Sequence, residues 1–162
     1  MKLYIAGPDV FRPDALHWAD TVRALCHERG HEALIPLDGD TATAEGIFRN
    51  NLALLQRADT VLANLNPFRG AEPDSGTCVE IGYALALGKP VIGYAAALTA
   101  LRQRVGGGKA VDADGYSVEN FGLPFNLMLS VPLQMVAGDI AVALDLLARE
   151  FTQNASLSAR QA

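Results

Sequence analysis

The sequence of 162 residues is poor in several features that would assign it to a common class. Its two cysteines, Cys26 and Cys78, lack metal-ligand spacing and suit a reducing compartment. The net charge is −5 and no basic cluster is present, which argues against nucleic acid or an anionic membrane as partner. The longest run of small apolar residues, 91–101, is about half the length that a membrane span needs.

Patterns for targeting and for cofactors are also missing. The N-terminal apolar run is too short for a secretory signal, because Pro8 and Asp9 end it. The first predicted strand ends in AGPDVF rather than in GxGxxG, and VGGGKA lacks the glycine spacing and the Ser or Thr of a P-loop. The three histidines fit surface positions better than a metal site. We therefore expect a cytoplasmic protein without a metal centre.

The apolar residues that are present suffice for one full-sized domain. Half of the residues are hydrophobic. Strand and helix patterns alternate along the chain: strands are predicted at 2–6, 33–35, 60–64, 90–94 and 133–136, and helices at 14–29, 43–57, 77–87 and 139–151. This alternation predicts an α/β fold with a five-stranded parallel sheet and helices on both faces. Residues 1–151 would form a single domain, and 152–162 a polar, flexible tail.

The segment 95–130 does not fit this alternation. It is too long for an ordinary connection between a strand and a helix. It contains three consecutive glycines at 106–108 and an apolar run at 121–129 without clear periodicity. Two interpretations stay open: the segment is a lid over a site, or it packs against another subunit.

Two carboxylates, Asp74 and Glu80, are the most informative residues for chemistry. They flank a turn of small residues where the third strand gives way to a helix, and open α/β sheets bind ligands at such switches. A pair of carboxylates is also the minimum apparatus for breaking a bond at the anomeric carbon of a sugar. A Glu in the first helical turn would feel the helix dipole, which favours its ionised, nucleophilic form.

A purely structural interpretation of Glu80 fits the same spacing. Thr77 and Glu80 match a capping box, in which the two side chains satisfy the first amides of a helix. The preceding loop, NPFRG at 66–70, is rich in functional side chains and favours a catalytic interpretation. The spacing alone leaves both interpretations open.

Several segments together resemble the nucleoside 2-deoxyribosyltransferase family. The matching pieces, in the family's order, are YIAGP at 4–8, PLD at 36–38, NNL at 50–52, AD at 58–59, NPFRG at 66–70, EPDSGT at 72–77, EIG at 80–82, Ala84 and FGLPFNLML at 121–129. The loop versions NPFRGxEPDSGT and GLPFNLML are most similar to the purine-preferring branch. The resemblance implies a flavodoxin-like (Rossmann-like) sheet and a homo-oligomer whose sites are completed by a neighbouring subunit.

The resemblance also implies residue roles. Glu80 would be the nucleophile that attacks C1′, Asp74 would handle the proton on the base, and Tyr4 would orient the nucleophile. Residues that would bind the substrate are Gly7, Pro8, Asp38, Asn51, Phe68, Arg69, Gly76 and Asn126. Asn126 would come from the neighbouring subunit and bind the 5′-hydroxyl of the sugar. Asn51 stands where some members have Asp.

The implied activity is transfer of a 2-deoxyribosyl group between nucleobases in nucleotide salvage, with retention of configuration and without a metal or organic cofactor. The partners would be deoxynucleosides and free bases. One alternative is hydrolysis of a deoxynucleoside or of its 5′-phosphate. A phosphate needs several cations or other donors, and Arg69 is the main cation near this motif, so a free 5′-hydroxyl is favoured. Another alternative is a nucleotide-binding module without catalytic activity.

Overall fold

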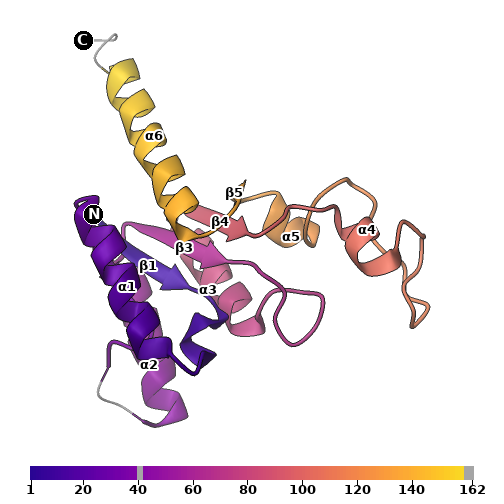
Figure 1. Ribbon diagram of the computed structural model, residues 1–162, viewed down its shortest axis with the longest axis horizontal. Helices are drawn as coiled ribbons and strands as arrows, with labels where there is room; N and C mark the ends of the chain where they lie inside the picture. The colour runs from indigo at the N-terminus through magenta and orange to yellow at the C-terminus, as the bar shows by residue number, and fades with distance from the viewer. Residues whose placement is uncertain (40–41, 159–162) are drawn as a thin grey trace.

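The computed structural model describes residues 1–39 and 42–158 and contains one parallel sheet (Figure 1). Its strands lie in the order β2-β1-β3-β4-β5, and every neighbouring pair is parallel. Their bounds are β1 Lys2–Ala6, β2 Glu32–Leu34, β3 Thr60–Asn64, β4 Val91–Ala95 and β5 Gln134–Ala137. The predicted fold class, a five-stranded parallel α/β sheet, is confirmed.

The bounds of the helices are η1 Pro8–Phe11, α1 Ala15–Glu28, α2 Ala44–Arg57, α3 Ser75–Ala86, α4 Leu101–Gly106, α5 Leu127–Ser130 and α6 Ile140–Ser158. The helices α1, α2 and α3 begin and end within two residues of the predicted positions, whereas η1, α4 and α5 were not predicted. Helix α6 continues to Ser158, so the first part of the predicted tail is helical, and 159–162 lie outside the described residues. Within the described ranges, no helix is both long and apolar enough to cross a bilayer.

Side chains of β1 alternate between two core layers, as expected for a strand that is covered on both faces. Leu3 and Ile5 pack in the layer that contains buried residues of α1 and α6. Tyr4 and Ala6 pack in the opposite layer, with buried residues of α2 and α3. This alternation places Tyr4 on the face of the sheet that α3 covers.

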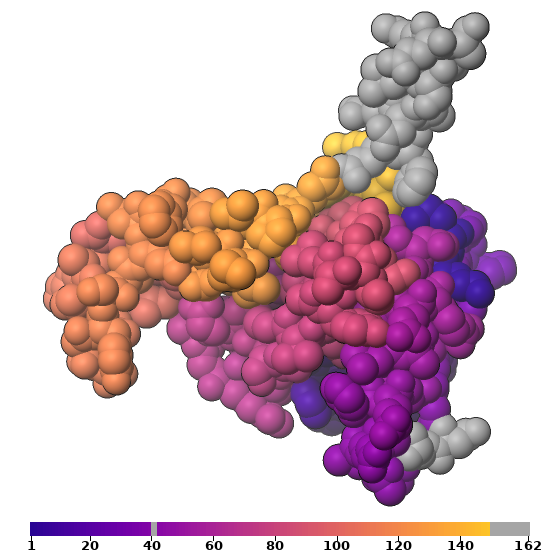
Figure 2. Space-filling model, turned by 180° about the vertical axis from the view of Figure 1, so that it is seen from behind, coloured from indigo at the N-terminus to yellow at the C-terminus, as the bar shows by residue number. Residues whose placement is uncertain are grey.

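The segment 96–130, here called the arm, stands out from the sheet and its helices (Figures 1 and 2). It contains α4, α5 and one isolated antiparallel bridge between Val111 and Ser117. Phe125 is buried and belongs to the core cluster on the α2 and α3 face. Phe121 and Met128 are exposed by 67% and 73%. The arm is therefore anchored by buried residues that include Phe125 and Leu101, and it carries other apolar side chains on its surface.

Candidate active site

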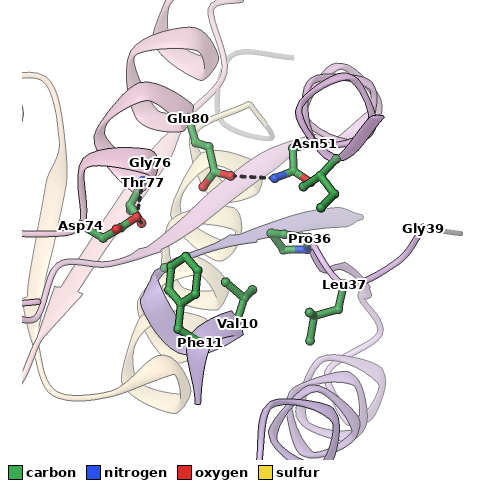
Figure 3. A pocket seen from close by; sticks show the side chains of 12 residues that line it. Val10, Phe11, Pro36, Leu37, Gly39, Asn51, Asp74, Gly76, Thr77 and Glu80 are labelled. Atoms are coloured by element: carbon green, nitrogen blue, oxygen red, sulfur yellow. Dashed lines mark hydrogen bonds between the residues drawn. The ribbon is translucent and has the colours of Figure 1, made fainter. Parts of the chain in front are cut away.

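The order of the strands reverses at β1, because β2 lies on one side of it and β3 on the other. A cavity of about 400 Å³ lies at this reversal. The carboxyl ends of strands at such a reversal form a natural crevice. The lining residues come from η1 and from the loop after β2, as well as from α2 and α3 (Figure 3). They are Gly7, Val10, Phe11, Pro36, Leu37, Gly39, Ile47, Asn51, Asp74, Gly76, Thr77 and Glu80.

Asp74 is the N-cap of α3. Its Oδ2 accepts hydrogen bonds from the Thr77 amide at 2.9 Å and from the Thr77 hydroxyl at 3.1 Å. A Cβ atom at Gly76 would lie 3.0 Å from Oδ2 of Asp74, so glycine leaves room for the carboxylate to fold over the helix end. Asp74 therefore has one oxygen in the cap, and its Oδ1 has no hydrogen-bond partner in the structure's described part.

The capping-box interpretation of Glu80 is wrong. The helix begins at Ser75, so Thr77 is its third residue and is itself capped by Asp74 rather than acting as the cap. Glu80 then lies in the second turn, too far along the helix to bond the N-cap amide. Its side chain points into the cavity instead (Figure 3).

The Glu80 carboxylate is held by two side chains from other elements. Its Oε1 accepts a hydrogen bond from the Tyr4 hydroxyl at 2.5 Å and one from Asn51 Nδ2 at 3.4 Å. Burial raises the pKa of Glu80 to about 7, and the nearby Asp74 charge adds to this, whereas the Tyr4 and Asn51 hydrogen bonds oppose it. The expectation that Glu80 lies in the first helical turn and is favoured as the ionised form is wrong, because α3 begins at Ser75 and burial disfavours the charge.

Tyr4 is fully buried on β1, in the middle of the core layer. Burial and the Glu80 charge both raise the pKa of its phenol. The neutral phenol is therefore favoured, and it can donate its hydrogen to Glu80. This geometry suits a residue that fixes the rotamer of the carboxylate.

Asn51, on α2, contributes an acceptor to the cavity. Its Nδ2 points to Glu80, while its Oδ1 is buried and has no hydrogen-bond partner among the described residues. A buried acceptor without a donor costs about 1–3 kcal/mol. A hydroxyl of a bound ligand would remove that cost.

An aromatic pair stands at the edge of the cavity. The rings of Phe11 and Phe68 are stacked with centroids 5.5 Å apart and planes at 13°. The Arg69 guanidinium lies over both rings, 5.1 Å from the Phe11 centroid and 4.7 Å from that of Phe68. Phe11 lines the cavity, whereas Phe68 and Arg69 do not. These two residues act on the cavity only by packing against the Phe11 ring.

Besides Phe68 and Arg69, three residues expected to bind substrate lie apart from the cavity lining. Asp38 uses its carboxylate to bind Arg23 and the Ile35 amide at 2.9 Å, which fixes the turn that carries Leu37. Pro8 begins η1. Asn126 lies on the arm.

The Asn126 side chain is fixed by its neighbours on the arm. Asn126 is the N-cap of α5: its Oδ1 accepts from the Met128 amide, and its Nδ2 donates to Glu119 at 2.6 Å. It lines a separate cavity, together with Cys78, Leu85 and Met128.

Sequence reasoning missed the apolar lining of the cavity. Val10, Phe11, Leu37 and Ile47 all line it, yet none stands out by residue type. Their only sequence signal is position: Val10, Phe11 and Leu37 follow β1 and β2 at the carboxyl ends of these strands, where parallel sheets bind ligands. No group of three or more His, Cys, Asp or Glu side chains that could hold a metal ion occurs in the described ranges.

Comparisons with known proteins agree with this geometry. Residues 3–128 match the family model described as Nucleoside 2-deoxyribosyltransferase. A solved structure titled as a 2-desoxiribosyltransferase from Leishmania mexicana is 40% identical, with a TM-score of 0.78 over 86% of this chain and 92% of that one. The chain belongs to the nucleoside 2-deoxyribosyltransferase family. The resemblance predicted from the sequence and the assignment to an enzyme are therefore confirmed.

Two curated relatives extend the family assignment. An uncharacterized Schizosaccharomyces pombe protein is 31% identical over 169 residues, covering 86% of this chain and 80% of that one. A putative 2′-deoxynucleoside 5′-phosphate N-hydrolase of Thermofilum pendens is 32% identical over 132 residues. The match covers 76% of this chain and 83% of that one. For this deoxyribosyltransferase family member, the comparisons support an activity of the transferase or the deoxynucleoside hydrolase type.

Proposed function

We propose that the protein transfers the 2-deoxyribosyl group of a deoxynucleoside to another nucleobase, with Glu80 as the covalent nucleophile. One observation carries this proposal: the buried Glu80 carboxylate points into a cavity of nucleoside size and is held through a single oxygen by Tyr4 and Asn51. Its Oε2 has no hydrogen-bond partner within the described ranges and is free to attack. Asp74 lines the same cavity.

The mechanism consists of two displacements at C1′. In the first, Glu80 Oε2 forms a bond to C1′ while the bond from C1′ to the base nitrogen breaks, and Asp74 gives its proton to the departing base through Oδ1. In the second, a new base attacks C1′, loses a proton to Asp74, and displaces the Glu80 ester. Two inversions retain the configuration at C1′.

The sugar would bind between Asn51 and a neighbouring subunit. The unpartnered Asn51 Oδ1 would accept a hydrogen bond from a sugar hydroxyl. No Lys or Arg is among the described residues that line the cavity, which favours a free 5′-hydroxyl over a 5′-phosphate.

A purine is the preferred base in this proposal. The wall opposite Glu80 is apolar, with Val10, Leu37 and Phe11 (Figure 3). The Phe11 ring lines the cavity, and its stacking on Phe68 supports it as a surface on which a base can stack. This complements the similarity of the loop sequences to the purine-preferring branch.

A shared site in a homo-oligomer completes the proposal. Asn126 lies on the protruding arm and outside the lining of its own subunit's cavity. The arm also exposes Phe121 and Met128, together with Val131 just beyond its end, and contiguous apolar surface commonly marks an interface. An arm that docks on a second copy would cover these side chains and bring Asn126 to the neighbour's cavity.

The second candidate function is hydrolysis, favoured by the relative from Thermofilum pendens. One experiment separates the candidates: the protein is incubated with deoxyinosine and free adenine, and the products are separated by chromatography. Deoxyadenosine is expected, whereas hypoxanthine without deoxyadenosine would establish hydrolysis. A parallel incubation with deoxyadenosine 5′-monophosphate should give much slower turnover than deoxyadenosine, and the opposite order would favour a nucleotide hydrolase.

A further inference from the structure

Outside the lining of the cavity, a chain of side-chain hydrogen bonds joins the loops that follow three strands. Asn64, the buried last residue of β3, donates from Nδ2 to Oδ2 of Asp9 at 2.7 Å. Its Oδ1 accepts from the amide of Asn66 at 3.0 Å and from the Nδ2 of Asn66 at 2.7 Å. Asn66 Oδ1 in turn accepts from the Ala96 amide at 2.9 Å, after β4. Asn64 is thus the junction of the loops after β1, β3 and β4.

The junction has little freedom to rearrange. A Cβ atom at Gly7 would lie 2.8 Å from Cβ of Asn64 and 3.2 Å from Oδ2 of Asp9, so the end of β1 packs directly on it. The Asn64 amide has one usable orientation, because flipping it would place its oxygen against the Asp9 carboxylate and its nitrogen against two donors. An aspartate at position 64 would therefore keep the bonds to Asn66 and lose the one to Asp9.

Two of the three loops that the junction holds carry one ring each of the aromatic pair. Asp9 lies in η1, two residues before Phe11, and Asn66 lies two residues before Phe68. Phe11 is 57% exposed, so the core does not fix its ring. The stacking at 5.5 Å therefore depends on where the two loops are held relative to each other.

We propose that Asn64 is a positioning residue: by joining Asp9 to Asn66, it keeps Phe11 and Phe68 stacked at the cavity edge and sets the affinity for the nucleobase. The inference rests on the proposed function in one respect, since it takes the ligand that binds beside these rings to be a nucleobase. Asn64 does not line the cavity, and its influence passes through the two rings.

The experiment measures the binding of free adenine by calorimetry. Asn64→Asp places two carboxylates in contact, and we expect adenine to bind at least about tenfold more weakly, which corresponds to about 1.4 kcal/mol. In the double variant Asp9→Asn with Asn64→Asp, the amide at position 9 can donate to the carboxylate at position 64. The hydrogen bond is thus restored with donor and acceptor exchanged. It should bind adenine within about threefold of the wild-type protein.

Two further variants separate positioning from a general structural effect. If Asn64 acts through the rings, Asn64→Asp should add less than about twofold to the loss caused by Phe11→Leu, because coupled changes are not additive. Asp14→Asn is the matched control: Asp14 is an acidic residue that pairs with Arg12, and no hydrogen bond or ion pair joins it to Asn64 in the described part of the chain. Its affinity for adenine should equal that of the wild-type protein.

Several outcomes would overturn the proposal. They are unchanged adenine affinity in a folded Asn64→Asp variant, no recovery in the double variant, additive losses with Phe11→Leu, or a wild-type protein that binds neither adenine nor any other common base. If Asn64→Asp does not fold, Asp9→Ala breaks the same hydrogen bond from the other side and should give a similar loss. Binding of adenine without any transfer to it would refute the proposed function alone and leave this inference standing.

Discussion

At the residue scale, the chemistry depends on Glu80, whose carboxylate the fold buries and aims at the cavity. Glu80→Ala should lower deoxyribosyl transfer by several orders of magnitude, as expected when a covalent catalyst is removed. Mass spectrometry of the wild-type protein incubated with a deoxynucleoside and no acceptor base should show a deoxyribosyl adduct on Glu80. A variant that keeps more than about a tenth of the wild-type rate would exclude the nucleophile role.

The pKa of Glu80 predicts the pH dependence of that step. Burial raises this pKa to about 7, and only the ionised carboxylate attacks C1′. We expect kcat/KM for a deoxynucleoside with an activated base, which leaves without a proton from Asp74, to fall about tenfold per pH unit below pH 7 and to level off above it. A profile that stays flat down to about pH 5 would show that Glu80 ionises at its ordinary value.

The same shift predicts a trade-off between stability and function. Between pH 4.5 and 7, the folded protein holds a proton on Glu80 that the unfolded chain releases, so the free energy of unfolding falls as pH rises through this window. Glu80→Gln removes that loss and should stabilise the protein at pH 8 by up to about 3 kcal/mol, but hardly at pH 4. Denaturant melts at both pH values test this, with Glu28→Gln on the exposed face of α1 as control.

At the element scale, the N-terminus of α3 has two roles, because Asp74 caps the helix and is also the proposed acid. Asparagine is as good an N-cap as aspartate but cannot give a proton. Asp74→Asn should therefore leave the unfolding free energy nearly unchanged and slow substrates with poor leaving bases more than activated ones. Asp74→Ala should show the same kinetic defect and in addition lose about 1 kcal/mol of stability. Equal kinetic losses for both substrate classes would leave Asp74 with a binding role only.

At the scale of the whole molecule, the arm decides whether a site is complete in one chain. If Asn126 enters the neighbour's cavity, mixing Glu80→Ala with Asn126→Ala subunits builds some sites in which both residues are intact. In a reciprocal dimer this is one site in two, so up to roughly half of the wild-type activity per mixed dimer should return. Activity is measured after subunit exchange has been verified with tagged chains.

The control mixture combines two variants whose altered residues belong to the same subunit's part of the site. Glu80→Ala mixed with Asp74→Asn should recover nothing, because both residues line the cavity of one subunit. Recovery there, or none in the Glu80 and Asn126 mixture, would contradict the shared site and confine Asn126 to its own chain.

The local sequence predicts elements well where the pattern and the packing agree. The strands β1 and β3 have the predicted bounds because their apolar runs are buried on both faces and end at turn residues. The start of α3 was harder to predict, because Asp74 and Thr77 are both good N-caps and only the fold shows which one bonds the helix amides. The arm has too little periodicity for either of its short helices to be predicted.

The sequence by itself determined the succession of the five strands and four longest helices along the chain, and the choice of the carboxylates Asp74 and Glu80, since these depend on apolar periodicity and on short motifs. Only the tertiary structure decided the pKa of Glu80, the meeting of Tyr4 and Asn51 at one of its oxygens, and the junction at Asn64. The reason is physical: desolvation and hydrogen bonding act between atoms that the sheet brings together from distant parts of the chain.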